Sequence, residues 1–157
     1  MQKLIFFLTL TSSLFLVSCT SNEGAVKKAA VAEGERQFTE TLTKESQDFI
    51  QSVFLRDAYV SYMKRNSEFD TEDVKVQGEL FATAVVTVKT YSPVLRRTVA
   101  RIANGVEAGH ERQFNFGNAI SLVAKQTGTS ASTEKQPLGV LKFQKNSSGD
   151  WLPQAEH

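Results

Sequence analysis

The 157-residue chain is poor in the side chains from which most catalytic and metal sites are built. It has one cysteine, two histidines, three prolines and one tryptophan. A single cysteine excludes an intramolecular disulfide and a cysteine-ligated metal cluster. His110 lies between Glu107 and Glu111 in sequence and is interpreted as a surface residue, and His157 is the last residue printed. The two histidines therefore predict no metal site.

Recognisable catalytic and nucleotide-binding motifs are also missing. The chain has no glycine-rich phosphate loop and no Gly-x-Ser-x-Gly motif. Its 18 Lys and Arg residues nearly balance 17 Asp and Glu residues, so charge gives no reason to expect a nucleic-acid partner. The acidic residues Glu68, Asp70, Glu72 and Asp73 lack the glycine and terminal glutamate of a calcium loop and are predicted to form a solvated turn. We therefore predict no catalytic residue, no metal and no cofactor.

The longest hydrophobic run is short and lies at the N-terminus. Residues 4–16 are mostly apolar and follow Lys3, and as a helix they would extend about 20 Å. A permanent membrane span needs roughly 30 Å of apolar helix. The positive charge followed by a short apolar segment is typical of a secretory signal peptide. The alternative, a buried core helix, is disfavoured by the position at the start of the chain.

The lone cysteine follows this segment as Leu16-Val17-Ser18-Cys19, which resembles the lipobox of bacterial lipoproteins. The resemblance implies a diacylglycerol attached to Cys19 and cleavage between Ser18 and Cys19. Because Thr20 follows, rather than the aspartate associated with inner-membrane retention, it implies an outer-membrane anchor facing the periplasm if the host has two membranes. The competing interpretations are an unmodified secretory thiol or a reactive nucleophile.

These sequence features divide the chain into three predicted segments. Residues 1–18 are predicted to be the signal peptide. Residues 19–34, which are small, polar and alanine-rich, are predicted to be a lipidated tether, although their composition also permits a frayed helix. The remaining residues, 35–157, have the length of a single domain.

Within that domain, residues 35–65 have the periodicity of one long helix. Its core stripe is formed by Phe38, Leu42, Phe49, Val53 and Val60. The second half has a wider apolar surface, which is expected either to pack in the core or to meet a partner.

The next two elements are a strand region and a helix. Residues 74–90 alternate between apolar and polar side chains, and Gly78 interrupts them as a bulge or as a turn between two strands. Ser92-Pro93 predicts the start of an amphipathic helix, with serine as the cap and proline in the first turn, and Gly109 is expected to end it.

The C-terminal third is predicted to be mainly extended. Residues 112–124 alternate around Gly117-Asn118, which favours a hairpin, and a helix over residues 118–126 is the competing assignment. Residues 128–136 are predicted to form a polar loop. Residues 138–145 and 151–152 then form a closing hairpin joined through a loop that contains Gly149.

The predicted fold class is α+β, with a long N-terminal helix packed on a curved antiparallel sheet and a second amphipathic helix between strand groups. This order, together with the C-terminal sequence LKFQKNSSGDWLP, resembles the cystatin/NTF2-like class. A helix between the strand groups departs from the simple cystatin order.

Two sets of side chains are candidate contact residues. Arg96, Arg97 and Arg101 are predicted to lie on the polar side of the second helix, where they would either contact anionic headgroups, an acidic protein or peptidoglycan, or form an ordinary solvated face. NTF2-like sheets often enclose a pocket, and that resemblance implies a lining drawn from Phe49, Phe54, Phe81 and Trp151.

The leading functional hypothesis is a lipid-anchored envelope protein that acts as a non-enzymatic interaction or assembly module. Its expected partners are the membrane, through lipidated Cys19, and another envelope protein or peptidoglycan. The alternatives are a pocket for a small apolar ligand or, less favoured, an enzyme whose site is not recognisable. The sequence predicts neither the ligand nor an oligomeric state.

Overall fold

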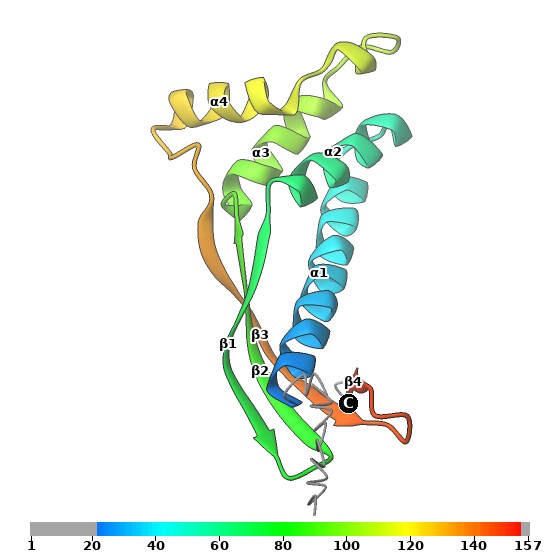
Figure 1. The fold of residues 1–157 in the computed structure, drawn as a ribbon. Helices are drawn as coiled ribbons and strands as arrows, with labels where there is room; N and C mark the ends of the chain where they lie inside the picture. The colour runs from blue at the N-terminus through cyan, green and yellow to red at the C-terminus, as the bar shows by residue number, and fades with distance from the viewer. Residues whose placement is uncertain (1–21, 155–157) are drawn as a thin grey trace, which may run out of the picture.

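The computed structural model describes residues 22–154 and confirms the α+β class. The chain forms helices α1 (Asn22–Phe49) and α2 (Val53–Arg65), strands β1 (Glu68–Gln77) and β2 (Phe81–Thr90), and helix α3 (Pro93–Asn104). A single 3-10 turn, Glu111–Gln113, precedes α4 (Phe116–Thr127), and strands β3 (Glu134–Lys145) and β4 (Trp151–Pro153) complete the described chain. Figure 1 shows the strands at one end of an elongated molecule and α2, α3 and α4 gathered at the other.

The strands form an antiparallel sheet in the order β1-β2-β3-β4, so each strand pairs with its neighbour in sequence. The β2–β3 ladder extends from Phe81 opposite Gln144 to Thr90 opposite Glu134, with one irregularity after Val86. The last strand is much shorter and pairs with β3 only through residues 143–145. The alternation predicted for β2 is confirmed, because Ala82, Ala84, Val86 and Val88 are buried.

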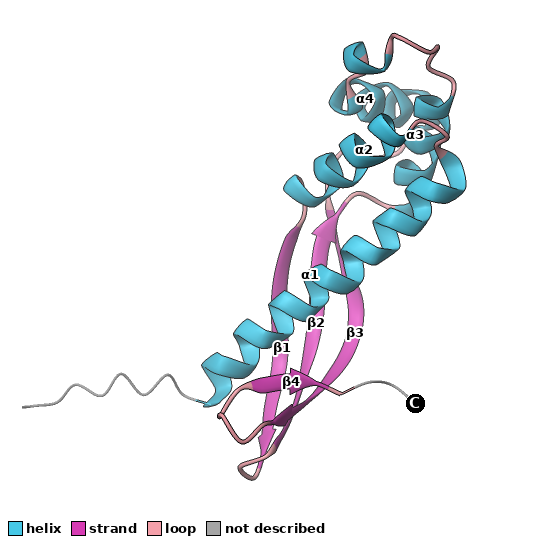
Figure 2. Cartoon of the chain, turned by 90° about the vertical axis from the view of Figure 1, so that its right-hand side faces the viewer, coloured by secondary structure: helices cyan, strands magenta, loops and turns pink. Residues whose placement is uncertain are grey.

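The long helix α1 lies along one face of this sheet and continues past it (Figure 2). Gly34 marks a close approach between the helix and the sheet. An added Cβ atom there would lie 2.6 Å from Cγ1 of Val86 and 3.4 Å from Cδ1 of Leu138. Because glycine has no side chain, the backbone of α1 can pack closely against β2 and β3 at this position.

Two groups of buried side chains are spaced along α1. The lower core joins α1 to the strands and contains Val26, Ala30, Ala82, Ala84, Val86, Phe143 and Trp151. The upper core joins the second half of α1 to α2, α3 and α4, and its members include Phe38, Leu42, Ile50, Leu55, Tyr59, Met63, Tyr91 and Phe116. We call the region formed by α2, α3 and α4 the head. The base is the opposite end, formed by the start of α1, the β1–β2 turn at residues 78–80 and the β3–β4 turn at residues 146–150.

The structure changes the assignment of the predicted tether. From Asn22 onward, residues 19–34 belong to α1, and both Val26 and Ala30 are completely buried. Alanine is the strongest helix former, and here alanines also fit where the helix lies close to the sheet. Lipidation of Cys19 and cleavage after Ser18 concern residues outside the described part of the chain.

The single helix predicted over residues 35–65 is wrong, because the chain turns between Phe49 and Val53. Ser52 caps α2 by accepting a hydrogen bond from the Leu55 backbone N–H, at 3.4 Å. The backbone N–H of Gln51 donates to Asn104 of α3, at 2.9 Å. A contact with the distant helix α3 therefore stabilises this break between α1 and α2. No glycine or proline at the break predicts it from the sequence.

Two other local predictions are wrong. Residues 68–73, expected to form a turn, belong to β1, where Glu68 forms an ion pair with Lys89 of β2 and Glu72 forms one with Lys135 of β3. The hairpin predicted over residues 112–124 is instead the 3-10 turn followed by α4. Asn115 caps this helix by accepting a hydrogen bond from the Asn118 backbone, so the competing helical assignment is closer to the structure.

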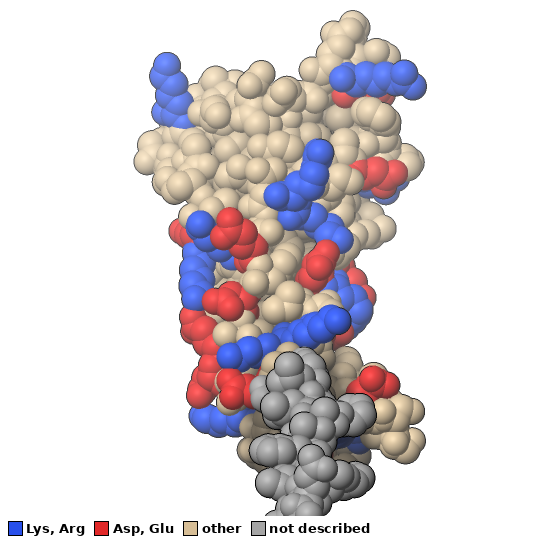
Figure 3. All heavy atoms as spheres, in the orientation of Figure 1, with Lys and Arg blue, Asp and Glu red and all other residues tan. Residues whose placement is uncertain are grey.

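The surface differs between the two ends. Figure 3 shows acidic and basic side chains intermixed over α1 and the strands, and a largely uncharged surface over the head. Among residues 22–154, no helix combines the length and the apolar character that crossing a membrane requires.

Candidate functional site

A groove with a volume of about 790 Å³ lies between α1 and β3. Its α1 wall is formed by Glu33, Arg36 and Gln37. Its other wall consists of residues 138–142 of β3, and Pro153 and Gln154 close the end next to β4. We refer to this feature as the β3 groove.

A charged network forms the α1 wall of the β3 groove. Arg36 donates two hydrogen bonds to the carboxylate of Glu33, at 2.8 and 2.6 Å, and the side chain of Gln37 donates a third at 2.9 Å. Arg36 also pairs with Glu40. The hydrogen bonds from Arg36 are the main reason that the pKa of Glu33 lies below its usual value, and Glu33 in turn raises the pKa of Arg36. Both groups are therefore charged at neutral pH.

Among residues 22–154, no strand pairs with the edge of β3 above residue 143, because β4 covers only the lower end of β3. The Lys145 backbone N–H donates to Leu80 on the β2 side, and the Lys142 carbonyl accepts from Gln154 on the opposite side. Backbone groups alternate in direction along a strand, so the N–H and C=O of Val140 also face away from β2. The Val140 side chain is 55% exposed. This part of the groove can accept hydrogen bonds from, and donate them to, an extended polypeptide.

Other features limit the length of that free edge. Pro137 has no N–H to donate, and Gly139, at φ +139°, lies at the irregularity in the β2–β3 ladder. Proline, irregularity and nearby lysines are the usual protection against unwanted pairing between sheet edges. The accessible edge is therefore confined to residues 139–141.

The predicted arginine surface is wrong, since Arg96 is buried inside the upper core and only 3% exposed. Its guanidinium donates two hydrogen bonds to Glu45 of α1, at 3.2 and 3.0 Å, and a third to the carbonyl of Tyr91, at 3.0 Å. The hydroxyl of Tyr59 donates to the same carboxylate at 3.0 Å. We call Glu45, Tyr59 and Arg96 the buried network. It joins α1, α2 and α3 and leaves Arg96 unable to reach a headgroup or a partner.

The other two arginines are at the surface but do not form a patch with it. Arg97 is half-exposed and lies 3.8 Å from Glu45. Arg101 lies over the ring of Phe49, 5.0 Å from its centroid. One of the three arginines therefore stabilises the interior, and a second is stacked on an aromatic ring.

The four aromatic residues predicted to line a pocket do not converge. Phe49 packs against the upper core, whereas Trp151 is buried in the lower core at the other end of α1. Phe54 and Phe81 are 50% and 45% exposed and lie on α2 and β2 respectively. None of these four residues lines the β3 groove or the shallower hollow between α1 and α2 that contains Gln47 and Arg56.

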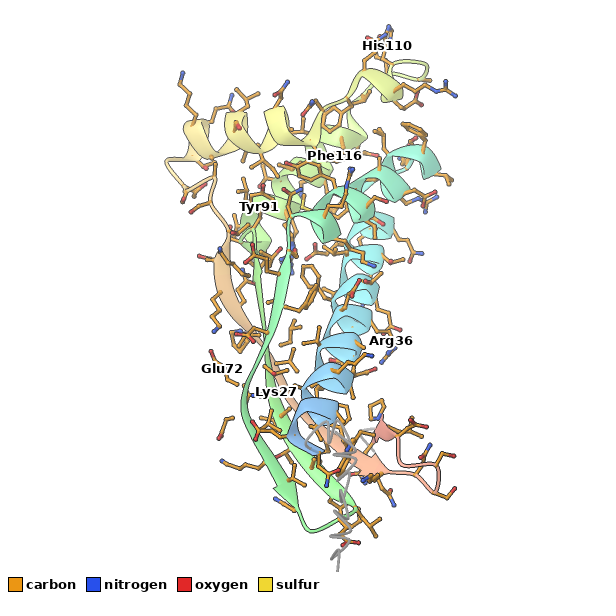
Figure 4. The ribbon with its side chains drawn as sticks, viewed as in Figure 1. Lys27, Arg36, Glu72, Tyr91, His110 and Phe116 are labelled. Atoms are coloured by element: carbon orange, nitrogen blue, oxygen red, sulfur yellow. The ribbon has the colours of Figure 1, made fainter. Side chains whose placement is uncertain are left out.

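The remaining candidate groups do not assemble into a reactive site. His110 lies at the top of the head (Figure 4), where its Nδ1 is 3.8 Å from the Glu107 carboxylate and both side chains are exposed. Within residues 22–154, no group of three or more histidine, cysteine, aspartate or glutamate side chains has a geometry that could hold a metal ion.

The base has an apolar surface that the sequence patterns did not indicate. Leu80, Phe81 and Leu152 are 52%, 45% and 51% exposed. The groove residue Glu33 was missed because residues 19–34 were interpreted as a tether, and Arg36 and Gln37 were missed because they lie outside the apolar stripe of the helix predicted over residues 35–65. Their spacing of three and four residues is a recognisable helical signal for mutual side-chain contact.

Comparison of the chain with protein-family models, with curated proteins and with solved structures found no significant match.

Proposed function

We propose that this chain is a lipid-anchored bacterial envelope protein, attached through Cys19, and that its domain is a non-enzymatic module that binds another envelope protein at the β3 groove. In a host with two membranes, we place the anchor in the outer membrane, with the domain facing the periplasm. Two or three acyl chains hold a protein stably, because each buried CH₂ contributes about 0.8 kcal/mol.

The observation that carries this proposal is the closeness of a rigid domain to the lipobox cysteine. In the sequence, only Thr20 and Ser21 separate Cys19 from Asn22, where α1 begins. Four residues later, Val26 is already completely buried against the sheet. An acyl chain on Cys19 would therefore hold the folded domain itself at the membrane, as expected of a module that presents a binding surface at a fixed height.

A protein partner suits the β3 groove better than a small apolar molecule. The groove combines backbone groups of residues 139–141, which pair with no other strand among residues 22–154 on this side of β3, with the charged side chains of Glu33 and Arg36. Extended polypeptides bind such edges through main-chain hydrogen bonds, and their side chains add specificity. An apolar ligand needs an enclosed pocket with mostly hydrophobic walls.

The anchor is tested by mass spectrometry of the N-terminal peptide from the full chain expressed in a bacterial host. We expect a peptide that begins at Cys19 and carries diacylglycerol, and we expect Cys19→Ser to lose both the lipid and the cleavage after Ser18. Ser21→Ala is the matched control and should keep both. An unmodified Cys19 in the membrane-bound protein would contradict the anchoring.

The binding surface is tested in the same cells with a photocrosslinking amino acid at Val140 or, as a control, at Val94 of α3. Both side chains are well exposed, at 55% and 69%. We expect one discrete protein adduct from position 140, absent from position 94 and weakened by Arg36→Glu. Identical adducts from the two positions would show that the groove is not the binding surface.

A further inference from the structure

The base presents an apolar cluster on the face of the sheet that α1 leaves uncovered. Phe81 lies opposite Gln144 on β3, and Gln144 lies opposite Leu152 on β4. Directly opposed residues point to the same face of a sheet, so Phe81 and Leu152 project from one surface with Gln144 between them. This surface is opposite the one that buries Ala82 and Phe143 under α1.

Leu80 lies in the β1–β2 turn, directly before Phe81, at the same end of the molecule. Its carbonyl accepts a hydrogen bond from the backbone of Lys145, at 2.8 Å, next to the Phe81–Gln144 pair. All three apolar side chains are about half-exposed. We refer to Leu80, Phe81 and Leu152 as the base cluster.

The described chain begins beside the base cluster. The Nζ atom of Lys145 is 3.1 Å from Oδ1 of Asn22, so the first residue of α1 lies against the same β3 residue that contacts Leu80. From Asn22 to Cys19 there are three Cα–Cα steps, each of about 3.8 Å, so a lipid on Cys19 is attached within about 11 Å of Asn22. The length of this connection limits which surface of the domain can face the bilayer.

The charges of the base are balanced. Lys27 forms an ion pair with Glu23, at 3.0 Å, and Lys75 pairs with Asp73, at 2.8 Å. An attraction to anionic headgroups would need an excess of lysine and arginine. Exposed apolar side chains also occur on the head, at Val53, Phe54, Val94 and Leu122, so apolar exposure alone does not distinguish the base. The base is distinguished by its closeness to Cys19 along the chain, and its apolar side chains match the boundary between headgroups and acyl chains.

We propose that the base cluster inserts into the membrane surface next to the lipidated Cys19 and orients the domain upright, with the head pointing away from the bilayer. This inference rests on the proposed lipid anchor. The 28 residues of α1, at 1.5 Å per residue, extend about 42 Å from the base to the far end of the helix, where it packs against the head. The β3 groove then opens above the membrane surface, where a partner can reach it.

The test uses the fact that Cys19 is the only cysteine and that lipidation consumes its thiol. In the lipidated full chain, Leu152→Cys or Leu80→Cys provides a single free thiol for a bimane label. Leu122→Cys in α4 is the matched control, because Leu152 and Leu122 are both 51% exposed. Each labelled protein is reconstituted into vesicles of phosphatidylethanolamine and phosphatidylglycerol that contain doxyl lipids as quenchers.

We expect bimane at positions 152 and 80 to be quenched at least about twofold and blue-shifted, and bimane at position 122 to be unchanged. Because the contact is apolar, raising the salt concentration should leave the quenching in place. Equal quenching at positions 152 and 122 in vesicle-bound protein that carries lipidated Cys19 would overturn the orientation and leave the anchor intact. Protein that lacks the lipid and does not float with the vesicles would overturn the anchor itself.

Discussion

The upper and lower cores pack against the same helix with side chains of different size. In the lower core, Gly34 and Ala30 of α1 lie close against Ala84 and Val86 of β2, so small residues allow a short distance between helix and sheet. In the upper core, the helices are held apart by large aromatic side chains. The ring of Phe116 packs against Tyr59 at a centroid distance of 5.9 Å.

The two cores also differ in their polar content. The buried network of Glu45, Tyr59 and Arg96 lies within the upper core. In the lower core, the Trp151 indole nitrogen is buried and has no hydrogen-bond partner among residues 22–154, and Lys145 lies over its ring. The lower core is therefore held together by the packing of complementary side chains. The upper core combines such packing with one set of buried hydrogen bonds.

The largest loss of stability should follow from removing the Glu45 carboxylate, which tests whether the polar content of the upper core matters. Glu45→Ala leaves Arg96 charged and unpaired in the interior, which costs about 3–5 kcal/mol of the free energy of unfolding. Glu23→Ala breaks an exposed ion pair and should cost less than about 1 kcal/mol. Urea unfolding at neutral pH measures both, and equal losses would mean that the buried network contributes no more than a surface pair.

A smaller loss should follow from Tyr59→Phe, which removes one hydrogen bond to Glu45 and leaves the ion pair in place. We expect a loss of about 1–2 kcal/mol at neutral pH. The substitution should also change the alkaline pH dependence. Burial, together with the nearby Glu45 carboxylate, raises the pKa of Tyr59 well above its usual value.

The sign of that dependence follows from proton binding. Above about pH 10 the unfolded chain loses the Tyr59 phenolic proton while the folded chain keeps it, so the free energy of unfolding falls as the pH rises. Tyr59→Phe should reduce this slope, as measured by urea unfolding from about pH 9 to 11. Burial also raises the pKa of Tyr62, to about 12, but that contribution is common to both proteins. Parallel curves for the two proteins would contradict the assignment.

The smallest expected effect tests the lower core through Gly34→Ala. The new methyl group would meet Val86, which costs about 1–3 kcal/mol, while the better helix propensity of alanine returns about 1 kcal/mol. We expect a net loss of about 1 kcal/mol in urea unfolding, and a smaller loss when the same change is made in a Val86→Ala background. Gly105→Ala, where φ is −84° and the nearest atom is 3.5 Å away, should change stability by less than about 0.5 kcal/mol. If Gly34→Ala is equally neutral, the close approach does not limit the packing.

Elements with strong local signals could be predicted from the sequence. The alternation in β2 placed Ala82, Ala84 and Val86 on one face, and Ser92-Pro93 located the start of α3, where the Ser92 hydroxyl accepts from the Leu95 backbone at 3.3 Å. In each case the residues that decide the structure are neighbours in sequence. The α+β class followed from these elements.

Elements decided by distant contacts could not be predicted. The strand at residues 68–73 looks like a turn because Glu68 and Glu72 point to the solvated face of the sheet and find lysine partners on other strands. Arg96 was predicted to be solvent-exposed. Its burial is possible because it pairs with Glu45, and Glu45 is 51 residues away in sequence. Residues of α1, β3 and β4 form the β3 groove together, so no single segment of the sequence predicts it.

The contact between Asn22 and Lys145 joins residues that are 123 positions apart, and the lower core likewise combines Val26 of α1 with Trp151 of β4. During synthesis, the N-terminal part of α1 therefore emerges long before the strands that cover it. Strands β1 and β2 are joined by the short turn at residues 78–80, whereas residues 91–133 separate β2 from its other partner, β3. The lower core can be complete only once β4 has been made, because Trp151 belongs to it.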